Sequence, residues 1–248
     1  MFRNLPTITK NLLLINLICY LADIVFQRYG IDFSHIFGLH YIAASDFHFW
    51  QPLTYMFMHA NFSHIFFNMF AVLMFAPALE ERWGSQRFLI YYLITGLGAA
   101  VVQEAVWAMR LQPVLNSVDV AMATALANRV VTIGASGAVF GILLAFGWLF
   151  PDVRMFIMFI PIPIRARTLV IIYALIELFS GVAPSAGDNV AHFAHLGGMI
   201  FGCILILLWQ YGNRIKDKWH DLFHPRHPRI KRDKDSVDYS DYHYHESL

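Results

Sequence analysis

Apolar residues in this chain are gathered into six long blocks, and the segments between the blocks are rich in charged residues, proline and glycine. Blocks of this kind are typical of helices that cross a bilayer, because about 20 apolar residues are needed to span its hydrocarbon core. We therefore predict an all-α membrane protein built as a bundle of six transmembrane helices, over residues 11–27, 63–79, 88–108, 132–150, 168–182 and 190–211.

The composition supports this prediction. Of the 248 residues, 58% are hydrophobic and only 14% are charged, whereas a soluble domain carries about 25% charged residues. The basic N-terminus would also suit a signal peptide, but no small-residue cleavage site follows, so we interpret the first block as a retained anchor. Cys19 and Cys203 both lie inside predicted spans, which indicates buried apolar side chains rather than a disulfide framework.

The same pattern divides the chain into an N-terminal tail, a membrane domain and a charged C-terminal tail that we expect to be disordered, at residues 1–10, 11–212 and 213–248. Within the membrane domain, residues 30–62 are rich in aromatic residues and histidine, which is typical of a long loop at the membrane interface. Two further stretches are interpreted as loops, residues 110–131 and residues 152–167.

Basic residues distinguish the two sides of the membrane. Six spans place both termini on one side, where fifteen of the 18 Lys and Arg residues then lie, and leave three on the other side, Arg28, Arg110 and Arg129. The positive-inside rule places both termini in the cytoplasm, and we expect a multi-pass protein of a bacterial plasma membrane. The net charge of +1 gives no indication of a nucleic-acid partner, so the expected partners are the lipid bilayer and other membrane proteins.

Polar residues open the second, fourth and sixth spans, which all run from outside to inside in this topology. His64 and Asn68 open the second span, Ser136 the fourth and His195 the sixth. A serine hydroxyl becomes a nucleophile when a histidine accepts its proton. His64 and Asn68 are four residues apart and share a helix face, so both can donate hydrogen bonds, together with the Ser136 N–H, to an oxyanion. We predict a Ser136–His195 dyad with this oxyanion site.

Glycines at a spacing of four follow both proposed reacting residues. Gly137 and Gly141 come after Ser136, and Gly198 and Gly202 come after His195. Small residues at this spacing let two membrane helices approach closely. We expect the two glycine faces to pack against each other and thereby to bring the serine and the histidine within hydrogen-bonding distance.

Simpler interpretations exist for each of these residues. Ser136 alone would be a small residue at a helix contact, and His64 alone would be an interfacial or capping residue. His192 lies three residues before His195, so it could itself be the base, or the two could bind a metal ion. The glycine face in register with His195 favours His195, which leaves His192 as a neighbour in the same cleft.

Ionisable residues elsewhere are expected to be solvated. Glu104 and Glu177 lie near the outer ends of the third and fifth spans, where a carboxylate is a functional candidate but water is also within reach. The histidines of the tail could bind metal, and we expect instead that they belong to a solvated segment: His220, His224, His227, His243 and His245. We therefore predict no metal site and no cofactor.

Together these residues resemble the rhomboid family of intramembrane serine proteases. Four motifs of that family occur in order between about residues 45 and 205: H-x-x-x-N at His64–Asn68 with His59 before it, E-x-R at Glu80–Arg82, G-x-S-G at Gly134–Gly137, and A-H-x-x-G-x-x-x-G at Ala194–Gly202. The resemblance implies a six-helix core with a Ser136–His195 dyad and an oxyanion site formed by Ser136, His64 and Asn68.

Two positions depart from the family's pattern. A frequent Trp-Arg pair of the first loop is Trp50-Gln51 here, and a tyrosine that some members carry four residues after the serine is Phe140. A phenyl ring can still pack on the imidazole but has no hydroxyl group. Neither difference removes a reacting group.

Three classes of function compete at this stage. The resemblance implies hydrolysis of peptide bonds in or beside transmembrane helices of substrate proteins. A rhomboid-like pseudoprotease that binds or escorts membrane proteins is the alternative, although Ser136 and His195 are both present. A transporter or a haem or metal protein is disfavoured, because the sequence has no H-E-x-x-H motif and no broken-helix repeat. The substrate, its cleavage site and the oligomeric state are left open.

Overall fold

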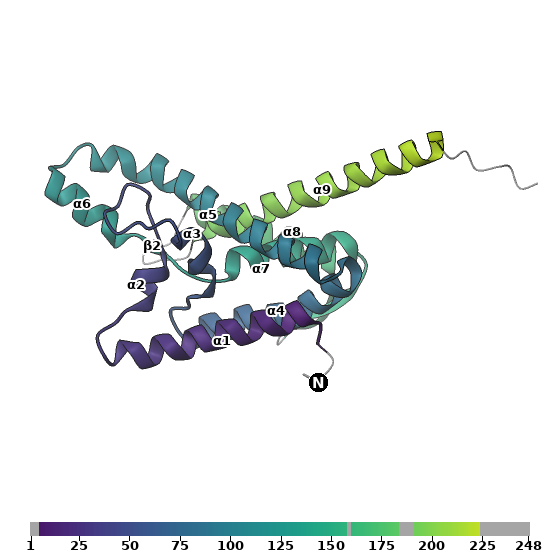
Figure 1. Ribbon diagram of the computed structural model, residues 1–248, viewed down its shortest axis with the longest axis horizontal. Coiled ribbons are helices and arrows are strands. Elements are labelled where there is room, and N and C mark those ends of the chain that lie inside the picture. Colours follow the sequence, from purple (N-terminus) through teal and green to yellow (C-terminus); the bar gives the residue numbers. More distant parts are fainter. Residues whose placement is uncertain (1–4, 158–159, 184–190, 224–248) are drawn as a thin grey trace, which may run out of the picture. The chain divides into compact units, whose positions relative to one another are not determined.

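The structure is a computed structural model that describes residues 5–157, 160–183 and 191–223. The chain divides into two compact units, residues 1–208 and 209–248, and the residues of the candidate site described below all lie in the first. Its elements in chain order are α1 (Thr7–Gln27), α2 (Phe33–Phe37), β1 (Leu39–His40), α3 (Gln51–Thr54), the 3-10 turn η2 (Tyr55–Phe57), α4 (Phe62–Trp83), α5 (Ser85–Leu115), α6 (Val120–Arg129), β2 (Val131–Thr132), α7 (Ser136–Leu149), β3 (Arg154–Ile157), β4 (Ile160–Arg165), α8 (Ala166–Val182) and α9 (His192–Phe223) (Figure 1).

Helices occupy all six predicted spans, but only part of the six-span prediction is confirmed. Within the described residues, α1, α4, α5 and the His192–Gly212 part of α9 are long and apolar enough to cross a membrane. The other two helices are shorter, with 14 residues in α7 and 17 in α8. Four candidate spans in one chain make this an integral multi-pass membrane protein.

α7 is short because the chain enters it as extended backbone. Thr132, where the predicted span begins, belongs to the strand β2 instead, and Gly134 then has φ +127°, a conformation that other residues rarely adopt. The helix packs against α4, α5 and α8. Half of its residues are buried, namely Gly137, Ala138, Val139, Gly141, Ile142, Ala145 and Gly147.

The four glycines of the predicted contact have different neighbours in the structure. A Cβ on Gly198 would overlap the carbonyl group of Gly137, so α9 and α7 touch through their backbones at this level. Gly141 faces Thr95 of α5, however, and Gly202 faces the Tyr91 hydroxyl group of α5. One helical turn further along α7 and α9, at Gly141 and Gly202, side chains of α5 therefore lie between the two helices.

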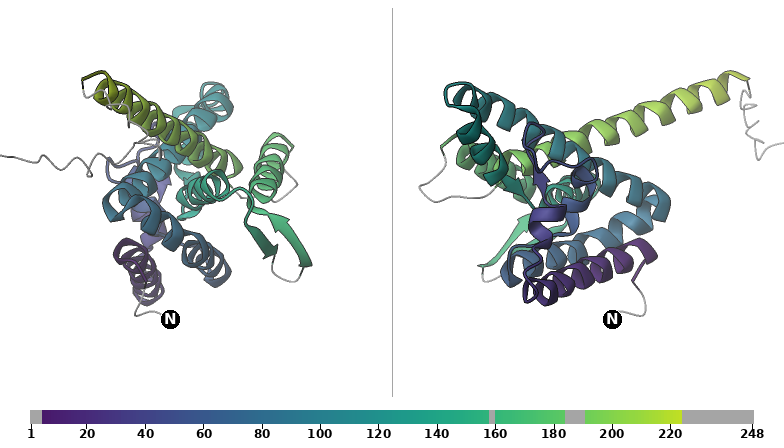
Figure 2. Two further views of the ribbon diagram at one scale, coloured as in Figure 1. Left: turned by 90° about the vertical axis from the view of Figure 1, so that its right-hand side faces the viewer. Right: turned by 60° about the vertical axis from the view of Figure 1, so that its left-hand side comes forward.

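α1 and α4 lie side by side (Figures 1 and 2), and the carboxylate of Glu80 joins their ends. Glu80 of α4 is only 2% exposed and accepts hydrogen bonds from the Ile8 N–H (2.9 Å), the Thr9 N–H (2.7 Å) and the Thr9 hydroxyl (2.8 Å). α1 has no capping side chain of its own at Pro6. Glu80 therefore satisfies amides that a helix N-terminus leaves without partners.

The long first loop is attached to the segment that leads into α7. β1 pairs antiparallel with β2, with His40 opposite Val131, and the Gly134 N–H donates to the Tyr55 carbonyl at 2.9 Å. Tyr55 is itself buried, and its hydroxyl donates to the Gly96 carbonyl of α5 at 2.7 Å. The approach to Ser136 is thus held from two directions.

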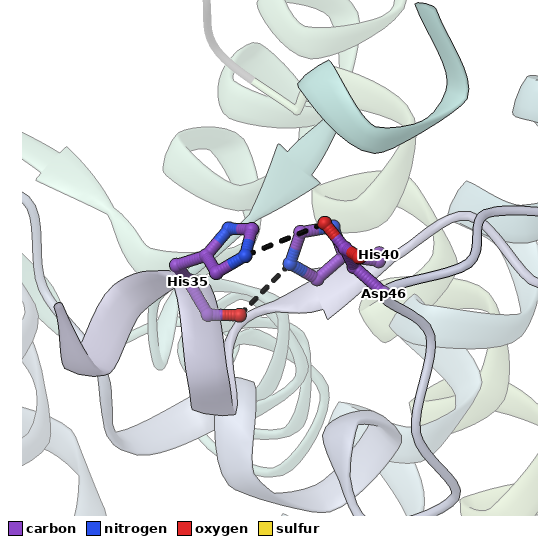
Figure 3. A group of neighbouring side chains, drawn as sticks. All are labelled: His35, His40 and Asp46. Carbon is purple, nitrogen blue, oxygen red and sulfur yellow. Dashed lines mark hydrogen bonds and ion pairs between the residues drawn. The ribbon is translucent and has the colours of Figure 1, made fainter. Parts of the chain in front are cut away.

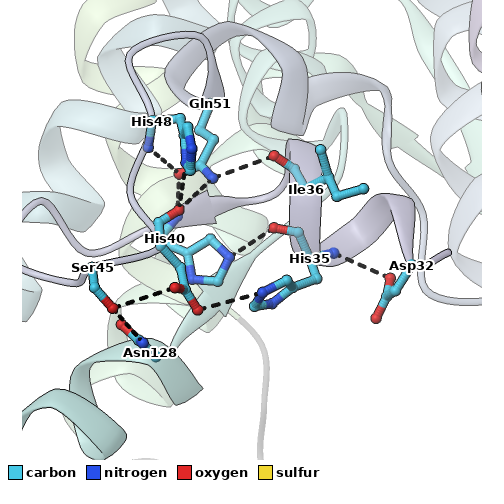
Figure 4. A network of polar contacts seen from close by, with 9 residues as sticks. Asp32, His35, Ile36, His40, Ser45, His48, Gln51 and Asn128 are labelled. Carbon is cyan, nitrogen blue, oxygen red and sulfur yellow. Dashed lines mark hydrogen bonds and ion pairs between the residues drawn. The ribbon is translucent and has the colours of Figure 1, made fainter.

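Gln51, the departure from the family's arginine, organises the inside of this loop (Figure 4). Its side chain is buried and accepts from the His40 and His48 N–H groups at 3.3 and 3.1 Å. It also donates to the Ile36 and Asp46 carbonyls, at 3.3 and 2.9 Å. Beside it, His35 pairs with the Asp46 carboxylate at 3.4 Å and its carbonyl accepts from His40 at 2.8 Å (Figure 3). The loop is therefore held by an internal network of hydrogen bonds.

Three stretches interpreted as loop or tail contain regular structure. Within residues 110–131, α5 continues to Leu115 and α6 follows, and both pack on a buried cluster with Tyr41. Residues 152–167 contain the β3–β4 hairpin, with Arg154 opposite Arg165 (Figure 2). The predicted tail begins at residue 213, but α9 continues to Phe223. The remaining tail, with His224, His227, His243 and His245, lies outside the described residues.

Candidate active site

Ser136 is the first residue of α7, and the local backbone explains its exposure to a cavity. A Cβ on Gly134 would lie 2.6 Å from Nε2 of His64, so only glycine leaves room for that ring beside the loop. The chain then turns directly into the helix, and the Ser136 N–H has no partner within the helix because it belongs to the first turn. The Ser136 hydroxyl group and the Ser136 backbone N–H therefore both lie at the start of α7.

His195 reaches this point from α9. Its Nε2 lies 2.8 Å from the Ser136 Oγ, although the two residues are 59 positions apart in the chain. The phenyl ring of Phe140 stacks on the imidazole, with 4.4 Å between ring centroids and 8° between ring planes. The expected packing of Phe140 is present, and it limits rotation of the histidine ring.

His192 lies on the other side of the same cluster. Its Nδ1 is 2.6 Å from Oε2 of Glu177, and the same oxygen is 2.9 Å from Nδ1 of His195. Of the two histidines, His195 is the one whose ring is hydrogen-bonded to Ser136. The ring of His192 contacts the Glu177 carboxylate instead.

The expectation that the two outer carboxylates are solvated is wrong for Glu177. Its residue is only 8% exposed, and both hydrogen bonds come from imidazole rings. Glu104 of α5 also has a protein partner, since it accepts from the Ile42 N–H at 3.0 Å. The apolar surroundings of Glu177 were the signal in the sequence, because a carboxylate in such a segment usually has a function or a partner.

His64 and Asn68 line a cavity of about 510 Å³ together with Ser136, Phe140 and His195. Asn61 caps α4, since its side chain accepts from the His64 N–H at 2.9 Å. The Nδ2 of the Asn68 side chain is buried and has no hydrogen-bonding partner among the described residues. A buried amide without a partner is costly, which makes Asn68 a candidate hydrogen-bond donor at this wall of the cavity.

His59 lies just before α4 and packs against this wall of the site. Its ring is 5.0 Å from that of His64, at an interplanar angle of 71°. Burial, followed by the neighbouring His64, lowers the pKa of His59 to about 3. His59 is therefore neutral in the folded protein at physiological pH, and the site gains no positive charge from it.

The sequence matches the Rhomboid domain over residues 46–211. This is more than half of the chain and includes every residue of the cavity named above. The chain belongs to the rhomboid family. The region of the match begins inside the first loop and ends near the end of the His192–Gly212 apolar segment, so α1 lies outside it.

Rhomboid proteins of several organisms are similar to this chain. Rhomboid-like protein 11, chloroplastic, of Arabidopsis thaliana is 30% identical over 214 residues, which are 79% of this chain and 63% of that protein. The putative rhomboid protease YdcA of Bacillus subtilis is 27% identical over 64% of this chain and 66% of its own length. Rhomboid-like protease 3 of Toxoplasma gondii is 28% identical over 71% of this chain and 58% of its own length. The chain thus spans about three-fifths of the length of these relatives, one of which is named chloroplastic.

Proposed function

We propose that this rhomboid protein is an intramembrane serine protease that hydrolyses peptide bonds in or beside transmembrane helices of other membrane proteins. The observation that carries the proposal is the 2.8 Å contact between Nε2 of His195 and Oγ of Ser136. Both residues line a cavity that Asn68 also lines, and the buried Nδ2 of Asn68 has no hydrogen-bonding partner in the described part of the chain. Relatives named as proteases support the same assignment.

Acyl transfer at this site begins on the serine. Nε2 of His195 accepts the Ser136 hydroxyl proton while Oγ forms a bond to the substrate carbonyl carbon, and the π electrons of that carbonyl move to its oxygen. The resulting oxyanion collapses, the C–N bond breaks, and Nε2 gives its proton to the leaving amine. Water then repeats the sequence on the acyl-enzyme, with His195 again accepting and returning one proton.

Stabilisation of the oxyanion is assigned to one backbone and two side-chain donors. The Ser136 N–H lies at the start of α7, where the helix dipole also favours negative charge. Asn68 offers its buried Nδ2, and His64 lies against Gly134 beside the same serine. Donors held in place before reaction contribute more than donors that must reorient.

Membrane orientation and substrates belong to the proposal as well. We place both termini in the cytoplasm from the distribution of Lys and Arg, which puts the Ser136 end of α7 toward the opposite surface. The bacterial plasma membrane is one location consistent with this orientation, and a chloroplast membrane is another, since the Arabidopsis thaliana relative is named chloroplastic. Substrates are expected to be membrane proteins, because only these present a helix to a site within the bundle.

The test compares Ser136→Ala and His195→Ala with the parent protein in cleavage of a model transmembrane substrate after purification. Each variant should lose essentially all cleavage, because removing one member of a catalytic pair costs about as much rate as removing both. The midpoint of thermal unfolding should stay near that of the parent protein. Ser117→Ala, an exposed serine after α5, is the matched control and should cleave normally. Cleavage by purified Ser136→Ala would end the proposal.

Labelling by a fluorophosphonate probe separates this proposal from the pseudoprotease alternative. An activated serine reacts with the probe, and the label should depend on both Ser136 and His195. A folded parent protein that binds membrane proteins but is neither labelled nor able to cleave them would support the pseudoprotease instead.

A further inference from the structure

Glu177 connects the two histidines of α9 through a single oxygen. Its Oε2 is 2.9 Å from Nδ1 of His195 and 2.6 Å from Nδ1 of His192. The side chains of all three residues are no more than 12% exposed. Glu177 belongs to α8, whereas Ser136 and His195 belong to α7 and α9. Its carboxylate contacts Nδ1 of His195, the ring nitrogen that does not face Ser136.

These contacts determine which nitrogen of His195 carries a proton. An ionised carboxylate only accepts hydrogen bonds, so each Nδ1 beside Oε2 carries a proton. A neutral imidazole has one N–H, and Nε2 of His195 therefore has a free lone pair. That lone pair faces the Ser136 hydroxyl at 2.8 Å. Glu177 thus selects the tautomer in which His195 can accept the serine proton.

The ends of α8 and α9 are held together close to Glu177. The guanidinium group of Arg110, on α5, donates to the Gly181 carbonyl at 2.7 Å and lies 5.0 Å from the centre of the Phe193 ring. A Cβ on Gly181 would come within 2.9 Å of Phe193, so α8 and α9 are in close contact one turn after the carboxylate. Phe140 covers the His195 ring from α7. The carboxylate and the imidazole are therefore both restrained.

We propose that Glu177 is a positioning residue for the Ser136–His195 pair, so that this protein uses a Glu–His–Ser triad in place of a dyad, with His192 holding the carboxylate. This inference rests on the proposed protease function. In the acylation step, the Ser136 proton moves to Nε2 of His195 and later to the leaving nitrogen. Glu177 stays ionised throughout, accepts the Nδ1–H, and stabilises the imidazolium that exists between these two transfers.

Glu177→Gln tests this role, because glutamine has nearly the same shape but no charge. We expect kcat to fall by about 100-fold or more, as when the acid of a triad is neutralised. KM should stay within about twofold, since Glu177 does not line the substrate cavity. Labelling of Ser136 by a fluorophosphonate should slow in parallel, and the midpoint of thermal unfolding should change little. A purely structural role would lower the midpoint and leave kcat per folded molecule intact.

Glu104→Gln is the matched control, since Glu104 is another partly buried carboxylate that accepts a backbone N–H, from Ile42. Its kcat and labelling rate should equal those of the parent protein. Glu177→Asp keeps the charge but shortens the side chain, so kcat should fall less than in Glu177→Gln. If Glu177→Gln does not fold, Glu177→Ala carries the test, and a folded Glu177→Ala protein with parental kcat would overturn the inference.

A metal ion is the competing explanation for the cluster, because ligand atoms of Glu177, His192 and His195 lie within 4.8 Å of one another. Dialysis against EDTA should leave kcat and thermal stability unchanged, and loss of either, restored by Zn²⁺, would overturn the triad. Different results would refute the protease proposal and the triad proposal. An inactive Ser136→Ala with a fully active Glu177→Gln would refute the triad alone, whereas an active Ser136→Ala would refute the protease and the triad together.

Discussion

Gly198 of α9 lies directly against the carbonyl group of Gly137 in α7, with no side chain between the two backbones. Gly137 follows Ser136, and Gly198 lies about one turn after His195. The separation of these helices at this point therefore sets the separation of the two proposed reacting groups. A misplacement of about 1 Å can reduce the rate of a reaction ~100-fold.

A methyl group at Gly198 should consequently be more damaging to activity than one at Gly202. Gly198→Ala must displace the Gly137 backbone, so we expect cleavage to fall by ~100-fold or more together with a lower midpoint of thermal unfolding. Gly202→Ala would instead meet the Tyr91 hydroxyl group, which donates to the Gly141 carbonyl at 2.8 Å. Its main effect should be on stability.

Tyr91→Phe provides the matched test of that difference. Removing the Tyr91 hydroxyl opens space for a methyl group at Gly202. The double variant Tyr91→Phe/Gly202→Ala should therefore be more stable than the sum of the two single effects predicts. No such compensation is expected between Tyr91→Phe and Gly198→Ala. Equal activities of Gly198→Ala and the parent protein would mean that the backbone contact does not control the site.

Asn68→Ala should lower kcat by about 10–1000-fold, because loss of one oxyanion donor costs up to ~4 kcal/mol of transition-state stabilisation. Its buried Nδ2 has no other partner among the described residues, so thermal stability should change little or increase slightly. Steady-state kinetics and a thermal unfolding curve on the same preparation give both quantities. An unchanged kcat would show that the amide serves only the packing of α4.

Glu80→Gln should destabilise the protein without affecting the chemistry. The carboxylate accepts two backbone amides of α1 and the hydroxyls of Thr9 and Ser85. Loss of its charge should cost about 2–4 kcal/mol of unfolding free energy, as expected for charge-assisted hydrogen bonds. Glu81→Gln, at the exposed neighbouring position, is the control and should have no measurable effect on the thermal midpoint.

Acid should destabilise the protein through His59. The pKa is lowered to about 3 by burial in the folded state and is about 6.5 in the unfolded chain. Between these values the unfolded chain binds a proton that the folded protein does not, so the contribution of His59 to stability falls as pH decreases below about 6.5, by up to ~1.4 kcal/mol per pH unit.

Thermal unfolding curves between about pH 7 and pH 4 measure this slope, since the unfolded imidazole titrates near pH 6.5. The slope should be reduced in His59→Phe, whatever the absolute stability of that variant, and should persist in His48→Gln. Parallel curves for His59→Phe and the parent protein would assign the acid sensitivity to other groups.

Much of this protein was determined locally by the sequence. Blocks of apolar residues located the helices, and the serine and histidine motifs identified the residues that meet at 2.8 Å. These features depend on a few neighbouring residues or on a motif, and such signals can be read without knowing how helices pack.

The tertiary structure decided which faces meet. Helix spacing places Gly141 and Gly202 on particular faces but does not show that Thr95 and Tyr91 of α5 fill the space between them. Likewise, Glu177 and His195 are 18 positions apart on different helices, and only the rotation and tilt of α8 against α9 bring carboxylate and imidazole together. Rotation and tilt result from the packing of all the helices at once, so no local pattern encodes them.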